Sequence, residues 1–219
     1  MKIELINASK IIKKVKILDS INLTLDSGKI YGLKGKNGSG KTMIMRLICG
    51  LIKPTDGKVV IDGEELGKDI AFPRSVGVLI ENPSFISEYT GAENLAMLAS
   101  IKNSIGKDEI NDVLTKVGLD PCDKRTYRKY SLGMKQRLGI AAAIMEKPDI
   151  VILDEPINAL DESGASVVRD ILKEQKERGA ICIVACHDSD ELHYLSDEII
   201  EVSDGRIIKC EKLGIPDEK

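Results

Sequence analysis

The sequence predicts an α/β fold with a mainly parallel core sheet, a flanking antiparallel β region and an α-helical insert. Three features of the pattern indicate this fold. A glycine-rich segment at 35–42 lies between a short apolar run and a helical pattern, apolar runs at 150–153 and 181–185 lie on either side of another helical pattern, and residues 90–145 are helical in pattern. Short, uniformly apolar runs are typical of parallel strands buried on both faces, so we place them in the core sheet.

In chain order, the first third is rich in strands. Apolar or alternating segments separated by turn residues predict strands at 3–6, 17–25, 30–33, 58–61 and 75–80. Turns are expected at 26–28 and 55–57, where glycine follows serine or aspartate. The last strand should end before Glu81-Asn82-Pro83, because proline disfavours a helical conformation in the residue that precedes it.

The middle of the chain carries three helical patterns, at 93–99, 110–117 and 131–145. Ser131 is a good N-cap residue for the third of them. These helices interrupt a chain that is otherwise rich in strands. We therefore expect a single domain over residues 1–219, in which residues 1–81 and 146–219 form the core and residues 82–145 form the helical insert.

The last third predicts a strand, helix, strand unit followed by a hairpin. Between the apolar runs at 150–153 and 181–185, apolar residues at helical spacing mark a crossover helix that Asp161 can cap. The strands at 199–202 and 206–208 then flank the turn residues Asp204 and Gly205, which predicts a β-hairpin at the end of the sheet.

The glycine-rich segment has the residue types that hold phosphate. It reads Gly35-Lys36-Asn37-Gly38-Ser39-Gly40-Lys41-Thr42 and fits the G-x-x-x-x-G-K-[ST] template. Glycine lets successive backbone N–H groups converge on phosphate oxygens, and the start of the following helix adds partial positive charge. Lys41 can reach the β- and γ-phosphates, and the Thr42 hydroxyl can bind Mg²⁺. The segment therefore predicts binding of a nucleoside triphosphate.

Two carboxylates directly follow the apolar run at 150–153. Asp154 and Glu155 should lie at the C-terminal edge of the parallel sheet, where α/β folds bind their ligands. One of them suits Mg²⁺, in most cases through water, and the other suits polarisation of an attacking water molecule. A solvated strand end is the alternative interpretation, but the phosphate-binding segment upstream favours a hydrolytic site.

Composition and charge argue against several other classes of function. The 219 residues have a net charge of −3 with both signs interspersed, so no basic stripe suggests a nucleic-acid partner. No apolar run approaches the roughly 18 residues of a membrane-spanning helix, and no secretory signal is evident. Cys182 and Cys186 beside His187 suit buried thiols better than a metal site, because an apolar strand separates the cysteines. These features favour a reduced, cytosolic chain.

Together the motifs resemble those of the nucleotide-binding subunit of ATP-binding cassette (ABC) transporters, over nearly the whole chain. Residues 35–42 match the family's Walker A loop, and residues 150–155 match Walker B. Tyr130-Ser131-Leu132-Gly133-Met134-Lys135-Gln136-Arg137 resembles the family signature, Asn158-Ala159-Leu160-Asp161 resembles the D-loop, and His187 stands at the position of the switch histidine. Many NTPases share a Walker A loop, whereas the signature and D-loop at these positions are specific to this family. The resemblance implies the ABC-ATPase variety of the P-loop NTPase fold, with a RecA-like core.

The resemblance also implies how the residues are used. In this family two subunits, of like or unlike chains, hold two ATP molecules head to tail between them. Contacts with the ATP held by the second subunit are implied for Ser131, Gly133, Met134 and Asp161. Glu155 and His187 are implied to be catalytic, and Thr42, Asp154 and Glu81 to serve Mg²⁺. The implied partners are the second ATPase subunit and an integral membrane permease, with no nucleic acid. The chain itself is implied to be cytoplasmic and peripheral on the inner face of the cell membrane.

Three features depart from the family pattern. Glu81 stands where glutamine is usual; it can still reach Mg²⁺ or the attacking water, but it adds negative charge near Asp154 and Glu155. In the signature, Leu132 and Met134 replace the first glycine and the glutamine. The aromatic residue expected to stack on adenine is absent from the matching stretch 10–13, which predicts weak discrimination between ATP and GTP.

The preferred hypothesis is an ATP-hydrolysing motor subunit for a separate permease. The signature and the Ile80-Glu81-Asn82-Pro83 stretch look most like the bacitracin and lantibiotic resistance branch, which moves antimicrobial peptides away from the membrane. Drug and polysaccharide exporters of the ABC-2 type share much of this pattern, so the expected cargo is an antimicrobial peptide or a drug. The main alternative is an ABC ATPase without a transport partner, such as a scaffold for iron–sulfur assembly. A P-loop kinase of another family is a third possibility, but it leaves the signature and Asp161 unexplained.

Overall fold

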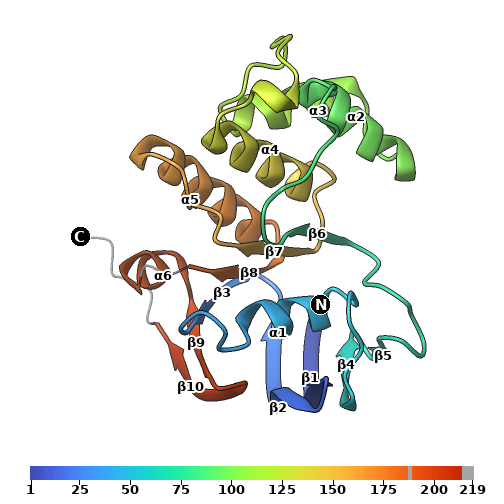
Figure 1. Cartoon of the computed structure of the whole chain (residues 1–219), viewed down its shortest axis with the longest axis vertical. Helices are drawn as coiled ribbons and strands as arrows, with labels where there is room; N and C mark the ends of the chain where they lie inside the picture. Colours follow the sequence, from blue (N-terminus) through green and yellow to red (C-terminus); the bar gives the residue numbers. More distant parts are fainter. Residues whose placement is uncertain (187–188, 214–219) are drawn as a thin grey trace.

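The structure is a computed structural model that describes residues 1–186 and 189–213. It contains two β-sheets (Figure 1). The larger sheet has the strand order β10-β9-β3-β8-β7-β6. Its strands are β3 (Lys29–Lys34), β6 (Val76–Leu79), β7 (Ile150–Asp154), β8 (Ile181–Ala185), β9 (Glu198–Ser203) and β10 (Arg206–Lys212). All neighbouring pairs are parallel except the β9–β10 hairpin, so the mainly parallel core sheet is confirmed.

The smaller sheet is antiparallel and has the order β2-β1-β4-β5. Its strands are β1 (Lys2–Ile12), β2 (Val15–Asp26), β4 (Asp56–Ile61) and β5 (Glu64–Glu65). The predicted turn at 55–57 is wrong in its last two residues. Asp56 and Gly57 belong to β4, because β1 continues far enough for Ser9 to pair with Asp56. The two-residue β5 carries no apolar pattern and was not predicted.

The helices lie on both sides of the larger sheet (Figure 1). They are α1 (Lys41–Ile48), α2 (Gly91–Lys102), α3 (Lys107–Lys116), α4 (Leu132–Ile144), α5 (Glu162–Glu177) and α6 (Ser189–Leu195), with a 3₁₀ turn at Tyr127–Lys129. The three helices of the insert and the crossover helix α5 are as predicted. The short α6 was missed, because only Leu192 and Leu195 mark its buried face. Within the described ranges, no helix combines the length and the apolar character that crossing a membrane requires.

Each face of the larger sheet packs into a separate hydrophobic core. Along β7, Ile150 and Ile152 face the core shared with α1 and the smaller sheet, whereas Val151 and Leu153 face the core shared with α4 and α5. All four side chains are fully buried. Alternate residues of one strand therefore fill two cores, which explains why this strand is apolar throughout.

Close contact between α4 and β6 fixes the helical insert on the sheet. A Cβ atom at Gly77 of β6 would lie 1.6 Å from the Ala143 carbonyl oxygen of α4, so only glycine allows the two elements to approach this closely. The neighbouring strand of β6 is β7, which ends in Asp154. The approach at Gly77 thus sets α4 beside the strand that carries the predicted carboxylates.

Candidate active site

The loop between β3 and α1 has the conformation that its glycines allow. Gly38 and Gly40 have φ values of 78° and 113°, which side chains with a Cβ rarely adopt. Gly40 is the N-cap residue of α1, and no side chain caps this helix. The first N–H groups of α1 therefore point at the loop without a side-chain acceptor, which is the arrangement that favours an anion.

Lys41 crosses this loop from the first turn of α1. Its Nζ donates hydrogen bonds to the carbonyl oxygens of Gly35 at 2.6 Å and Lys36 at 3.3 Å. The residue is only 6% exposed. A buried ammonium group is costly unless acceptors surround it, so the loop carbonyls hold Lys41 at the place where a phosphate is predicted.

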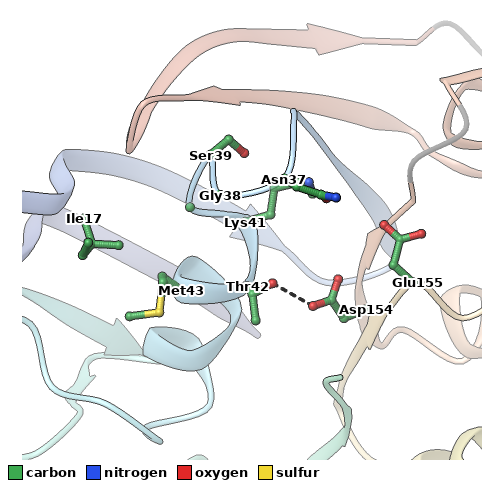
Figure 2. A pocket seen from close by; sticks show the side chains of 10 residues that line it. Ile17, Asn37, Gly38, Ser39, Lys41, Thr42, Met43, Asp154 and Glu155 are labelled. Carbon is green, nitrogen blue, oxygen red and sulfur yellow. Dashed lines mark hydrogen bonds between the residues drawn. The ribbon is translucent and has the colours of Figure 1, made fainter. Parts of the chain in front are cut away.

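Thr42 and Asp154 meet although 112 residues separate them in the sequence. The Thr42 hydroxyl donates a hydrogen bond to Asp154 Oδ2 at 2.8 Å, across the gap between α1 and the end of β7 (Figure 2). A hydroxyl and a carboxylate at this distance are hard oxygen donors of the kind that Mg²⁺ takes. The pair therefore fits the ion that the sequence predicts there.

A cavity of about 390 Å³ opens at this point, within the size range of ligand sites. Glu155 lines it beside Asp154 (Figure 2). The buried Oγ of Ser39 has no hydrogen-bond partner among the described residues, which leaves a polar atom in the loop for a ligand. The full lining consists of Ile17, Asn37, Gly38, Ser39, Gly40, Lys41, Thr42, Met43, Asp154 and Glu155.

Ile17 is the one apolar lining residue from β2, and the sequence did not single it out. The nearby stretch that lacks the expected aromatic residue is exposed: Ile11 is 45% and Ile12 is 40% exposed. Ile17 lines the cavity beside the phosphate loop, so it can offer a ligand an apolar contact but no aromatic face.

Glu81 has a partner that the sequence did not indicate. Its carboxylate forms an ion pair with the Arg46 guanidinium of α1 at 2.5 Å, and its backbone has a positive φ of 63°. Arg46 thus offsets the negative charge that Glu81 adds near Asp154 and Glu155. The contact of Glu81 with Mg²⁺ stays a prediction.

The residues of the predicted signature and D-loop lie at two helix starts. Ser131 is the exposed N-cap residue of α4, and its Oγ accepts a hydrogen bond from the Met134 N–H at 3.2 Å. Asp161 caps α5 and accepts from the Gly164 N–H at 2.9 Å. The hydrogen bond from the Gly164 N–H is the largest cause, and that from the Ser163 hydroxyl the next, of a pKa of Asp161 below its usual value. Both caps were predicted from the sequence.

The two histidines differ in what the structure describes. His187 lies outside the described residues. His193 is exposed on α6 and its Nδ1 lies 2.6 Å from the Ser189 carbonyl oxygen, so it is part of a helix surface. Cys182 and Cys186 are buried as predicted. Burial raises the pKa of the Cys182 thiol to about 12, so this thiol stays protonated at neutral pH.

Comparison with known proteins places this site in one family. The sequence profile described as "ABC transporter" matches residues 18–158. An uncharacterized ABC transporter ATP-binding protein of Bacillus subtilis, YybJ, is 48% identical over 96% of this chain and 97% of its own length. The bacitracin transport ATP-binding protein BcrA of Enterococcus faecalis is 41% identical over 94% of this chain and 68% of its own length. The lantibiotic transport ATP-binding protein SrtF of Streptococcus pyogenes is 36% identical over 92% and 87%.

Solved structures agree with these relatives. An ATP-binding subunit of an ABC transporter superimposes with a TM-score of 0.88 at 25% identity, over 97% of this chain and 90% of that protein. A dimeric bacterial ABC transporter cassette, MJ0796, superimposes with a TM-score of 0.87 at 26% identity, over 97% and 99%. Fold, site geometry and relatives therefore lead to one conclusion: the chain belongs to the ABC transporter family, as one of its ATP-hydrolysing subunits.

Proposed function

We propose that this chain hydrolyses MgATP in the cavity between α1 and β7, as one half of a head-to-tail dimer that drives the export of an antimicrobial peptide through a separate permease. The hydrogen bond between Thr42 and Asp154 carries the proposal. It joins the phosphate-binding loop to the carboxylate strand, so one cavity contains both the groups for binding and the group for hydrolysis.

The polar groups at this site have distinct tasks in the proposed reaction. The loop N–H groups and Lys41 hold the phosphates, while the Thr42 hydroxyl and the Asp154 carboxylate hold Mg²⁺. When bound, the ion neutralises charge on the β- and γ-phosphates. Glu155 orients the attacking water and accepts a proton from it, which suits a carboxylate placed directly after the strand. Glu81, released from Arg46, is a further ligand for the ion or the water.

The head-to-tail dimer supplies the groups that this cavity lacks on its own. Ile17, residues 37–43 and residues 154–155 line the cavity, whereas Ser131 and Gly133 lie at the start of α4. The exposed N-terminus of α4 offers N–H groups to an anion from outside the chain. We infer that Ser131, Gly133, Met134 and Asp161 contact the ATP held by the second subunit; the dimeric structure of MJ0796 supports this arrangement.

The relatives support a membrane partner and a peptide cargo. BcrA is described as a bacitracin transport protein and SrtF as a lantibiotic transport protein. We assign this chain the same kind of cargo. We also propose that residues 81–94 and the rest of the helical insert, which spans residues 82–145, form the surface that docks the cytoplasmic helices of the permease. With this partner, the chain would act at the inner face of the cell membrane. An ABC ATPase without a transport partner is not favoured, because these relatives are transport proteins.

Replacement of Glu155 by Gln tests the hydrolytic role. The variant keeps the size of the side chain but cannot accept a proton from water, so ATP turnover should fall by about 100-fold or more. ATP should remain bound and the dimer should persist, as measured by nucleotide retention and light scattering. Glu177→Gln, on the exposed end of α5, is the matched control. Hydrolysis near the wild-type rate in Glu155→Gln would contradict the assignment.

Affinity purification from detergent-solubilised membranes of the native host tests the partner. A polytopic membrane protein that copurifies in stoichiometric amount is the expected result, and its family would define the cargo. A soluble partner, or none in membranes despite good expression, would instead favour the ABC ATPase that works without a permease.

A further inference from the structure

Gln136 connects the signature helix to the residue that acts on water. Its Nε2 donates one hydrogen bond to the carbonyl oxygen of Glu155 at 2.9 Å and another to that of Pro156 at 3.1 Å. An amide nitrogen has two hydrogens, so two successive carbonyl groups use both of its donors. Gln136 is only 8% exposed, and loss of its amide would remove a hydrogen-bond donor from each of two successive carbonyl groups.

The backbone that Gln136 holds is in an uncommon conformation. Glu155 has a φ of 51°, in the left-handed region that costs a residue with a Cβ about 1 kcal/mol or more. Such a conformation persists when neighbours hold the adjoining peptide groups. The Glu155 N–H donates to the Ala185 carbonyl oxygen of β8 at 2.8 Å, and its own carbonyl accepts from Gln136 and, at 3.2 Å, from the Asn158 N–H. Peptide groups on both sides of Glu155 are thus held by hydrogen bonds, which sets the direction in which its Cα–Cβ bond leaves the backbone.

Two more contacts tie the first turns of α4 to the same segment, residues 155–161. A Cβ atom at Gly133 would lie 3.0 Å from the Ala159 carbonyl oxygen. Arg137 Nη2 lies 3.5 Å from Asp161 Oδ1, and Arg137 Nη1 donates to the Val117 carbonyl oxygen at 3.1 Å. The start of α4 therefore rests on this segment at three places, and among these contacts Gln136 alone bonds to Glu155 itself.

We propose that Gln136 is a positioning residue for hydrolysis, which holds the Glu155 carboxylate in its working direction and makes that direction depend on the position of α4. This inference rests on the proposed function, because it requires Glu155 to act on the attacking water. In the proposed dimer, α4 begins at the ATP of one site while Glu155 of the same chain serves the other. Movement of α4 against one ATP is then transmitted through Gln136 to hydrolysis of the second.

Replacement of Gln136 by Met tests this inference on the full-length protein. Methionine has a similar length and volume but no N–H donors, so Glu155 loses its tie to α4 while the phosphate loop is untouched. We expect the single-turnover rate of MgATP hydrolysis to fall about 10- to 100-fold, as for a misplaced catalytic group. The Kd for MgATP should stay within about three-fold of the wild-type value, because Lys41 and Thr42 keep their contacts.

Combination with Glu155→Gln separates positioning from general damage. If Gln136 acts through Glu155, the double variant should hydrolyse ATP within about three-fold of Glu155→Gln alone. The matched control is Gln175→Met, since Gln175 is 3% exposed on α5 and its Oε1 accepts from Arg178 Nε at 2.8 Å, away from the cavity. This control should lose stability without a specific loss of rate.

Two results would overturn the inference: a folded Gln136→Met variant that hydrolyses ATP at the wild-type rate, or a double variant in which the two losses multiply. If the methionine variant does not unfold cooperatively on heating, Gln136→Glu, of the same length, replaces it with the same expected loss and the same two contrary results. Failure of the proposed function is distinguishable. In that case Glu155→Gln itself keeps its activity, whereas failure of this inference alone leaves Glu155→Gln inactive and Gln136→Met active.

Discussion

Lys41 provides the sharpest test of how the loop binds nucleotide. Replacement by Met keeps the apolar stem, which is almost wholly buried, and removes only the ammonium group. In the structure that group donates to the carbonyl oxygens of Gly35 and Lys36. With ATP bound, we expect it to donate to the β- and γ-phosphates instead.

The size of the effect follows from these contacts. A hydrogen bond to a charged group contributes about 1.5–3 kcal/mol, so two phosphate contacts contribute about 3–6 kcal/mol. Lys41 gives up two hydrogen bonds to carbonyl oxygens when it binds phosphate, and the loss of each offsets about 1 kcal/mol of this contribution. A net loss of about 1–4 kcal/mol corresponds to an increase in Kd of about 5- to 700-fold.

Calorimetric titration with ATP at fixed salt measures this change. The titration is run with Mg²⁺ and again with EDTA, and Lys58→Met on the exposed surface of β4 is the control for loss of one positive charge. The reasoning is refuted if Lys41→Met binds ATP within about three-fold of the wild type. It is also refuted if the defect disappears in EDTA, because Lys41 acts on phosphate directly.

Three further predictions concern the metal, stability and the base. Thr42→Val removes the hydroxyl at constant shape, so affinity for MgATP should fall about 10-fold while affinity in EDTA is unchanged; an equal loss in EDTA would contradict a role in metal binding. Burial raises the pKa of Tyr31 to about 12 from 10.0, so its contribution to stability is complete below pH 10 and is lost as the pH rises through about 12. In urea unfolding between these pH values, Tyr31→Phe should lose less stability than the wild type, by up to about 3 kcal/mol, and identical pH slopes would contradict this. Because the lining residue Ile17 offers no aromatic face, GTP should compete with ATP within about 10-fold; a strong preference for ATP in a competition assay would refute this.

Sequence patterns of short range predicted most of this fold and the centre of the site. The loop at 35–42 depends on glycines and on a strand and helix beside it, and Asp154 ends a strand that is apolar throughout. Each of these features is visible within about ten residues, and the right-handed βαβ rule then brings them to one edge of the sheet. The predicted turn at 55–57 failed where pairing with a distant residue decides the outcome, because Asp56 pairs with Ser9 and so belongs to β4. The short helix α6 was missed because its local apolar pattern is weak.

Side-chain pairs between distant elements could not be predicted in this way. Glu81 and Arg46 are 35 residues apart and belong to a loop and a helix with no common pattern, so their ion pair follows only from the folded chain. The sequence indicated an excess of negative charge at Glu81, and the structure adds the cation that offsets it. The same holds for Gln136, which in the sequence is only one polar residue of a motif.

Gly77 explains why a residue of the inserted helices can serve the core site at all. An insert that joined the core only through its two linkers would place Gln136 loosely, and a hydrogen bond to the Glu155 carbonyl would not survive the motion. Because α4 lies against β6 at the distance that only glycine permits, the helix and the sheet behave as one packed layer beside β7. Any movement of α4 must then either break this packing or carry the turn at Glu155 with it. If the permease docks on the insert as we propose, a force on the insert would act on the same contacts that we infer to orient the carboxylate.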